Sequence, residues 1–285
     1  MDATSWIESS SDRTTPREHQ LRAAANGGVV AAVLFIAISL GGFLVSDAYA
    51  RETPSWAVQA VAQDWFDLIV AGPCLLIAAL AAWRGSRRGQ LVLGGFLLYT
   101  IYTLVIYAFG VHLNALFLLY CAGLGVALYS LITLARGLPP LDSLTSWDPR
   151  LPRRAVGGFL ITIGIAFGAL WLTQLIPAAL HGRDPQELVD TGLFTNPIHV
   201  LDLSFILPLH VLAGVWLWRR RANGVALAAV MLAFGILMAG SIGFLVVMME
   251  VAAVSGGGVP VAIAMGTVTL ASFGLLAWLL RSVPE

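Results

Sequence analysis

Acidic and imidazole side chains share one face of the apolar stretch 197–218. His199, Asp202 and His210 follow one another at intervals of three and eight residues, which place them on the same side of an α-helix. Asp202 would lie near the outer membrane surface and His210 near mid-membrane, because each helical residue rises about 1.5 Å. A carboxylate and an imidazole on one face can bind a cation or carry protons, and ionisable residues in a membrane helix are a first indication of function.

These residues belong to a larger polar group near one end of the predicted helices. We expect an outward-facing polar cavity between two halves of the chain, in which Asp67 and Asp202 bind a cation or gate protons. The alternative is structural: each aspartate caps its helix or pairs with an arginine such as Arg51 or Arg183, and His210 is a neutral imidazole bonded to a neighbouring helix. The candidate residues are Asp64, Asp67, His112, Asn114, His199, Asp202, His210 and Glu250.

No catalytic arrangement is predicted from the sequence. It contains no HExxH, CxxC, nucleotide-binding loop or Ser/His/Asp motif. Its two cysteines, Cys74 and Cys121, lie in apolar runs typical of buried positions. All sixteen basic residues are arginine, so a Schiff base with retinal or pyridoxal phosphate is excluded. An enzyme is therefore the less favoured class, no metal site is predicted, and the cofactor is left undetermined.

The composition is that of a protein embedded in a lipid bilayer. Hydrophobic residues make up 58% of the 285 positions and charged residues 11%, with a mean hydropathy of +0.84. A soluble domain carries about 25% charged residues to keep its surface hydrated. The net charge of zero offers no basic face to nucleic acid, so the bilayer is the expected partner.

Eight stretches are long enough to cross a hydrocarbon core about 30 Å thick, which needs about 20 apolar residues per helix. Arginines are concentrated in the terminal segments and in every second connecting segment. The positive-inside rule then places these segments, and so both termini, in the cytoplasm. We therefore predict an all-α protein of a bacterial inner membrane, with spans at 27–46, 65–83, 91–109, 115–135, 155–176, 197–218, 225–249 and 259–280.

The chain also carries an internal duplication. Residues 67–89 match residues 202–224 at seven of 23 positions without a gap, and the identities include Asp, Pro, Trp and Arg. Gly27-Gly28 similarly corresponds to Gly157-Gly158. Four helices per unit make the two repeats parallel. The predicted organisation is a tail 1–26, a first repeat 27–135, a cytoplasmic linker 136–154 that is extended and proline-rich, and a second repeat 155–281.

Local signals predict further details of the outer loops and the helix surfaces. Thr53-Pro54 and Asp184-Pro185 are each expected to start a short helix on the outer membrane surface, the second with Glu187 completing a capping box. Tyr99 and Tyr102 lie deep in their span and need partners, which could be a quinone, a lipid head group or other helices. Small residues indicate close packing within the bundle or between subunits of a homo-oligomer or membrane complex, at Gly164/Gly168 and at Gly235/Ala239/Gly243.

Two groups of residues resemble a family of multipass bacterial membrane proteins to which no activity is attached. One is Tyr102, Tyr107, Phe109-Gly110, Asn114, Leu116-Phe117-Leu118 and Tyr120, and the other is Asn196-Pro197, His199 and Val200-Leu201-Asp202-Leu203. The resemblance implies a bacterial inner membrane and no particular function. Haem A synthases also have a four-plus-four arrangement and place paired haem-ligand histidines on the second and fourth helices of each half. The second, fourth and eighth predicted spans of this chain contain no histidine, so the match fails.

Three classes of function follow from these observations. A permease-like protein for a small solute or an ion is favoured by the duplication, the paired aspartates and the prolines at positions 73 and 208. A scaffold or assembly subunit of a membrane complex fits the apolar helices and their small-residue surfaces. A redox protein binding haem or quinone would have to use the few histidines.

Overall fold

The computed structural model describes residues 15–138, 151–221, 223–254 and 258–284, and these described residues form helices and no strands. Eight of the described helices are long and apolar enough to cross a membrane, at the eight places predicted from the sequence. The chain is therefore a multipass membrane protein. The predicted linker contains Pro139, Pro140 and Pro149, which lie outside the described residues.

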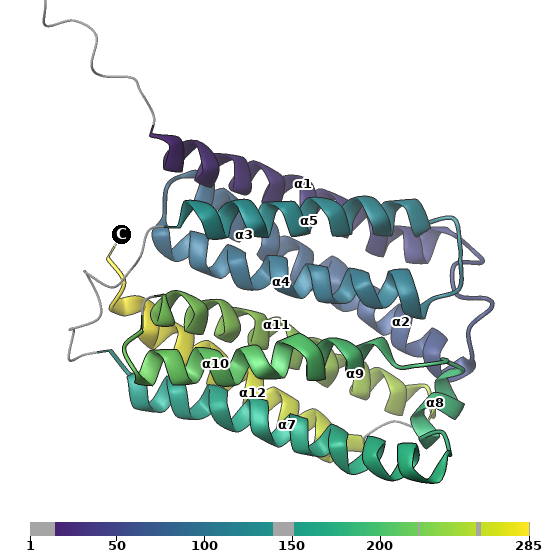
Figure 1. The fold of residues 1–285 in the computed structure, drawn as a ribbon. Helices are drawn as coiled ribbons and strands as arrows, with labels where there is room; N and C mark the ends of the chain where they lie inside the picture. The colour runs from purple at the N-terminus through teal and green to yellow at the C-terminus, as the bar shows by residue number, and fades with distance from the viewer. Residues whose placement is uncertain (1–14, 139–150, 222, 255–257, 285) are drawn as a thin grey trace, which may run out of the picture.

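The first half of the chain forms a closed four-helix bundle (Figure 1). Helix α1 packs against both α3 and α5, and α4 packs against the same two helices on the other side. The elements are α1 (Pro16–Leu44), α2 (Pro54–Phe66), the π-helical turn η1 (Asp67–Ala71), α3 (Gly72–Trp83), α4 (Arg87–Gly110) and α5 (Phe117–Gly137).

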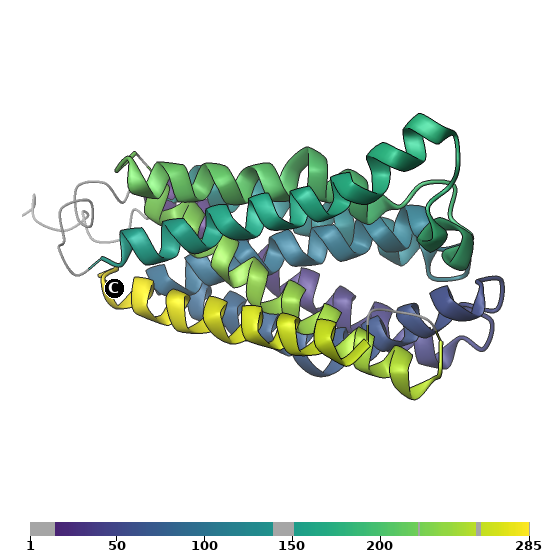
Figure 2. The same cartoon turned by 90° about the horizontal axis from the view of Figure 1, so that it is seen from below.

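The second half uses the same order of helices but leaves its bundle open. Helix α7 packs along α10, and α12 packs along α11, whereas α7 and α12 barely touch each other (Figure 2). The elements are α7 (Arg153–His181), α8 (Gln186–Thr191), α9 (Pro197–Leu201), the π-helical turn η2 (Asp202–Ile206), α10 (Leu207–Trp218), α11 (Gly224–Val251) and α12 (Gly258–Arg281).

Helices α4 and α11 join the two halves. Gly95 lies so close to α11 that a Cβ atom on it would collide with the backbone carbonyl of Val230 and lie 2.5 Å from the Ala233 Cβ. Small residues permit this approach of two helix backbones in a membrane. Gly95 and Val230 are 135 positions apart, which is also the offset between the similar stretches 67–89 and 202–224.

A π-helical turn interrupts the second span of each half at the same place. The Gly72 N–H donates to the Asp67 carbonyl, and the Leu207 N–H donates to the Asp202 carbonyl. Pro73 or Pro208 follows directly, and a proline ring clashes with the carbonyl four residues earlier in a regular α-helix. The wider π turn accommodates each ring without ending the helix.

The arginines separate the two ends of the bundle. At one end, which we call the arginine-rich end, lie the start of α1, the end of α12 and the α5 and α7 ends that flank the linker (Figure 1). Of the described arginines, only Arg51 and Arg183 belong to the opposite end, which we call the loop end. The others are Arg17, Arg22, Arg84, Arg87, Arg88, Arg136, Arg153, Arg154, Arg219, Arg220, Arg221 and Arg281.

Three local predictions differ from the structure. Helix α1 begins at Pro16, within the predicted tail, because Thr15 and Glu18 form a capping box. Thr53 does cap a helix, but that helix continues through η1 and α3 as one span, Pro54–Trp83, and is no separate surface helix. Helix α8 begins at Gln186 without a side-chain cap, because Glu187 accepts a hydrogen bond from Asn196 instead.

The small-residue surfaces are used within the chain. A Cβ on Gly164 would lie 2.8 Å from the Leu207 carbonyl oxygen of the adjacent span. Gly235 and Gly243 of α11 face Ser272 and Met265 of α12. These contacts correspond to the first of the two alternatives for the small-residue surfaces, which is packing inside the bundle. Association between chains stays a prediction.

Replacing Gly95 with Ala should weaken the contact between the halves. We expect a loss of about 1–3 kcal/mol of unfolding free energy, because the added methyl group meets backbone atoms that cannot move aside. Thermal unfolding of the purified protein measures the change. Gly125→Ala is the matched control, since nothing lies within 4 Å of the position of its Cβ; equal stability of the two variants would contradict the proposed close contact.

Candidate functional site

Two tyrosines of α4 hold one aspartate from each half. The Tyr99 hydroxyl donates to Asp67 Oδ1 at 2.8 Å, and the Tyr102 hydroxyl donates to Asp202 Oδ1 at 3.0 Å. Gln63 Nε2 adds a second donor to Asp67 Oδ1 at 2.9 Å, and Trp171 Nε1 donates to Asp202 Oδ2 at 2.8 Å. Because these tyrosines are three residues apart, one face of one helix reaches both carboxylates.

Neither aspartate fulfils the structural alternative drawn from the sequence. Asp67 and Asp202 begin π-helical turns inside continuous spans, and neither side chain makes a described capping hydrogen bond to the start of its helix. The described hydrogen bonds to them come from neutral tyrosine, glutamine and tryptophan side chains, and no described salt bridge involves them. A buried carboxyl group without an opposite charge depends on such hydrogen bonds.

A third carboxylate, Asp64, is fully buried one turn before Asp67. The Tyr49 and Tyr107 hydroxyls donate to its two oxygens at 2.6 and 2.8 Å. Burial, followed by the nearby Asp64 charge, raises the pKa of Tyr49 well above its usual value, so this tyrosine remains a hydrogen-bond donor. Gly42 of α1 lies directly against the carboxylate, and a Cβ there would collide with it.

Asp67 is also the carboxylate with an unsatisfied atom. Its Oδ2 is buried and has no hydrogen-bond partner among the described residues, although Oδ1 accepts two hydrogen bonds. Unpaired buried polar atoms are rare in folded proteins, because each loses its hydration without compensation. Asp67 therefore depends on Tyr99 and Gln63 more than Asp202 depends on any one partner.

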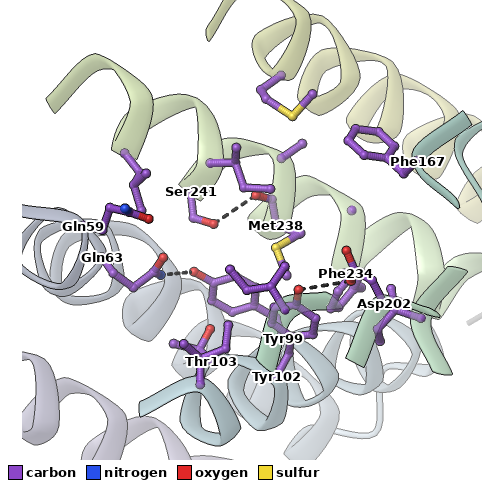
Figure 3. A pocket seen from close by; sticks show the side chains of 18 of the residues that line it. Gln59, Gln63, Tyr99, Tyr102, Thr103, Phe167, Asp202, Phe234, Met238 and Ser241 are labelled. Carbon is purple, nitrogen blue, oxygen red and sulfur yellow. Dashed lines mark hydrogen bonds between the residues drawn. The ribbon is translucent and has the colours of Figure 1, made fainter. Parts of the chain in front are cut away.

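A cavity of about 240 Å³ lies between the two halves (Figure 3). Its walls come from α2, α4, α7, α9, η2, α10, α11 and α12 and are mainly apolar. The polar side chains in the wall include those that hold the aspartates, together with Asp202 itself: Gln59, Gln63, Tyr99, Tyr102, Thr103, Asp202, His210 and Ser241.

The structure brings together some of the predicted site residues and separates others. Asp202 and His210 line the cavity. Asp67 lies behind the cavity wall and is connected to it through Tyr99 and Gln63, and Asp64 is connected through Tyr107. The prediction that Asp67, Asp202 and His210 line a single cavity therefore needs this correction for Asp67.

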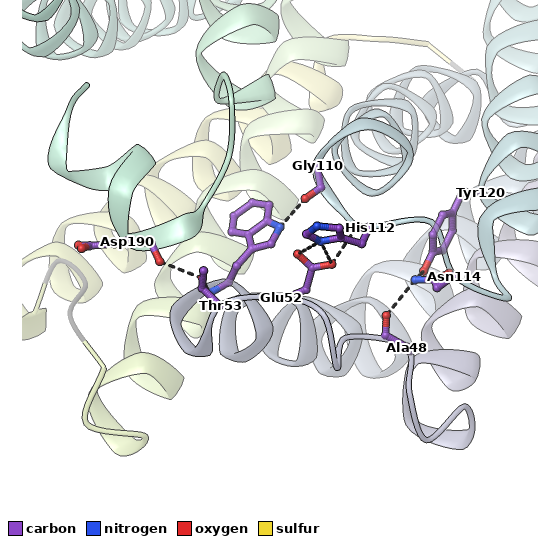
Figure 4. A network of polar contacts seen from close by, with 9 residues as sticks. Ala48, Glu52, Thr53, Gly110, His112, Asn114, Tyr120 and Asp190 are labelled. Atoms are coloured by element: carbon purple, nitrogen blue, oxygen red, sulfur yellow. Dashed lines mark hydrogen bonds and ion pairs between the residues drawn. The ribbon is translucent and has the colours of Figure 1, made fainter. Parts of the chain in front are cut away.

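The loop-end residues form a separate structural network (Figure 4). His112 Nδ1 lies 3.1 Å from both carboxylate oxygens of Glu52, and Asn114 Nδ2 donates to the Ala48 carbonyl at 3.0 Å. Neither His112 nor Asn114 lines the cavity, and Glu250 is exposed in the last turn of α11. These three candidates therefore lie outside the cavity.

His199 lies beside the cavity, behind Trp171. Its ring is stacked at a tilt on Trp171, with centroids 4.5 Å apart, and its Nε2 lies 3.6 Å from Glu187 Oε2. Burial raises the pKa of Glu187, while the hydrogen bond from Asn196 opposes that shift. His199 thus positions the indole that donates to Asp202.

Several cavity residues were not predicted from the sequence. Gln63 precedes Asp67 by one helical turn, so its i,i+4 spacing could have identified it. Trp171, Phe167 and Phe234 lie in apolar runs, where an aromatic residue facing a cavity looks like one facing lipid. Tyr99 and Tyr102 were expected to need partners, and they bond to other helices of the bundle.

Comparison of the chain with protein-family models, curated proteins and solved structures finds no match. Among the described residues, no group of three or more His, Cys, Asp or Glu side chains is arranged to hold a metal ion. The geometry of the cavity itself must therefore carry the functional interpretation.

Tyr99→Phe should destabilise the protein by about 1–3 kcal/mol, because it removes a donor from a fully buried carboxylate that already has one unpaired oxygen. Thermal unfolding in detergent measures the effect. The control is Tyr129→Phe, whose side chain is 71% exposed. Identical melting curves for the two variants would show that Asp67 does not depend on the Tyr99 hydroxyl.

Proposed function

We propose that this chain is a permease-like membrane protein that binds a small solute between its two halves, with Asp202 as the anchor. The observation that carries the proposal is a buried carboxylate in the wall of a cavity inside the membrane-spanning region. Each Asp202 oxygen accepts one described hydrogen bond, and a carboxylate oxygen can accept two. Acceptor capacity therefore remains for a solute.

The chemistry of the cavity favours a cationic or strongly donating group on an apolar body. Asp202 supplies negative charge, and the described residues provide no salt bridge to balance it. The rings of Tyr102 and Phe234 lie 5.8 Å apart beside it, and aromatic faces attract ammonium groups. The remaining wall, with Ile163, Phe167 and Leu245, suits an aliphatic or aromatic body.

The proposed architecture is two parallel four-helix repeats with both termini in the cytoplasm of a bacterium and the loop end outside. The equivalent π turns at Asp67 and Asp202 support the duplication, as does the contact of Gly95 with Val230 at the same 135-residue offset. The concentration of arginines at one end supports the orientation. A solute-binding site between repeats is typical of transporters.

A second candidate, a scaffold or assembly subunit, is favoured by one specific observation. The cavity is closed toward the arginine-rich end by close apolar packing, including the approach of Gly95 to Val230. A scaffold needs such rigid contacts between helices and does not need a path across the membrane. A permease needs the contact between α4 and α11 to change during its cycle.

The permease proposal predicts charge-selective binding. The purified protein should be thermally stabilised by phenethylammonium but not by its neutral and anionic analogues, phenethyl alcohol and phenylacetate, because only the ammonium pairs with Asp202. Asp202→Asn should weaken that binding about tenfold or more, since a charge-assisted hydrogen bond contributes about 1.5–3 kcal/mol. Thermal shift and uptake of the radiolabelled amine into proteoliposomes are the measurements.

Asp184→Asn is the matched control, because Asp184 is exposed near α8 and away from the cavity. Its affinity and uptake should equal those of the unmodified protein. Binding without uptake would favour the scaffold candidate, with the cavity as a ligand site. Equal responses to the cation and its uncharged analogue would remove Asp202 as the anchor and contradict the proposal.

A further inference from the structure

The space between α7 and α12, which we call the seam, is open where the other half is closed. The corresponding helices α1 and α5 pack closely along their length, with Gly123 against Ile38 and Gly137 against Leu21. By contrast, the described residues of α7 and α12 barely touch each other. Direct packing of these two helices therefore does not close the seam.

The seam leads into the cavity. Ile163, Phe167 and Trp171 of α7 form one side of the cavity wall, and Met265 and Val268 of α12 form the other. In Figure 3, Phe167 projects from α7 near α12, across the cavity from Tyr102. The apolar side chains along the seam are thus continuous with the cavity wall that contains Asp202.

The loop end of the cavity, by contrast, is bridged by contacts between helices and loops. Trp56 Nε1 donates to the Gly110 carbonyl at 2.6 Å, and a Cβ on Gly110 would lie 3.3 Å from both Trp56 and Pro197. The Thr53 hydroxyl donates to the Asp190 carbonyl at 2.9 Å and ties the two halves together there (Figure 4). A solute from water would have to break these contacts, whereas one from the bilayer would not.

We infer that the ligand of this cavity is a single-chain amphiphile with an ammonium head group, taken up from the bilayer through the seam. This inference rests on the proposed function and specifies its substrate class. The head group pairs with Asp202 beside Tyr102 and Trp171, and the alkyl chain remains between α7 and α12. Burial of an alkyl chain between apolar side chains needs no polar partner, and only the head requires one.

The test uses a long-chain alkylammonium that carries a photoreactive diazirine in its chain, added to the protein in liposomes. After irradiation, mass spectrometry of the digested protein locates the adducts. We expect them on the seam-facing residues Phe167, Met265 and Val268. Excess phenethylammonium should reduce these adducts by competing for Asp202, and it should leave adducts on lipid-exposed residues such as Phe273 unchanged.

Two variants separate the seam from the anchor. Val268→Trp fills the seam at the cavity wall, so seam adducts should fall about tenfold. Phe273→Trp, on the exposed face of the same helix, is its control and should leave the seam adducts unchanged. Asp202→Asn should weaken phenethylammonium binding and reduce the seam adducts, each about tenfold or more.

The outcomes distinguish this inference from the function on which it rests. Adducts spread evenly over all exposed apolar faces, together with normal phenethylammonium binding, would overturn entry through the seam and leave the permease proposal standing. Seam adducts that are unaffected by Asp202→Asn would show that the probe occupies the seam as an ordinary lipid does. That result would overturn the inference that the ligand is an amphiphile held by its ammonium head group. Absence of phenethylammonium binding to the unmodified protein would overturn both the permease proposal and this inference.

Discussion

Three carboxylates are buried inside this helix bundle, and the described contacts that hold them come from hydroxyl, amide and indole donors. Because no described salt bridge neutralises Asp64, Asp67 or Asp202, their burial depends on donors placed at hydrogen-bonding distance. Helix α4 supplies Tyr99, Tyr102 and Tyr107 for that purpose and also packs against α11 of the second half. The position of α4 therefore couples the stability of the carboxylates to the contact between the halves.

The two halves have the same order of helices but differ in how closely their first and last helices pack. In the first, α1 and α5 close the bundle, and its aspartates are sealed behind Tyr99 and Tyr107. In the second, the equivalent helices α7 and α12 separate, and Asp202 is exposed to a cavity. Duplication followed by divergence at a few packing positions would produce this division of a stable unit and an accessible one.

The eight spans were predictable because the thickness of the hydrocarbon core imposes a length that apolar runs reveal directly. Asp202 and His210 were correctly placed on one face by helical periodicity. Asp67 was not, because whether a carboxylate faces a cavity or lies behind Tyr99 depends on packing between helices distant in sequence. The seam was equally inaccessible to prediction, since the surfaces of α7 and α12 have the same composition whether they touch or face lipid. The Thr53 cap indicated where a helix starts but not that it continues for 30 residues.

The two helices that flank the seam differ in length. Helix α7 has 29 residues and α12 has 24, so α7 is about 7.5 Å longer at 1.5 Å per residue. Helices of unequal length match a given hydrocarbon thickness at different tilts. The angle between α7 and α12 is therefore coupled to the thickness of the surrounding bilayer. Lipid acyl-chain length thus becomes a variable that acts on the width of the seam, without any ligand and without any change in the protein sequence.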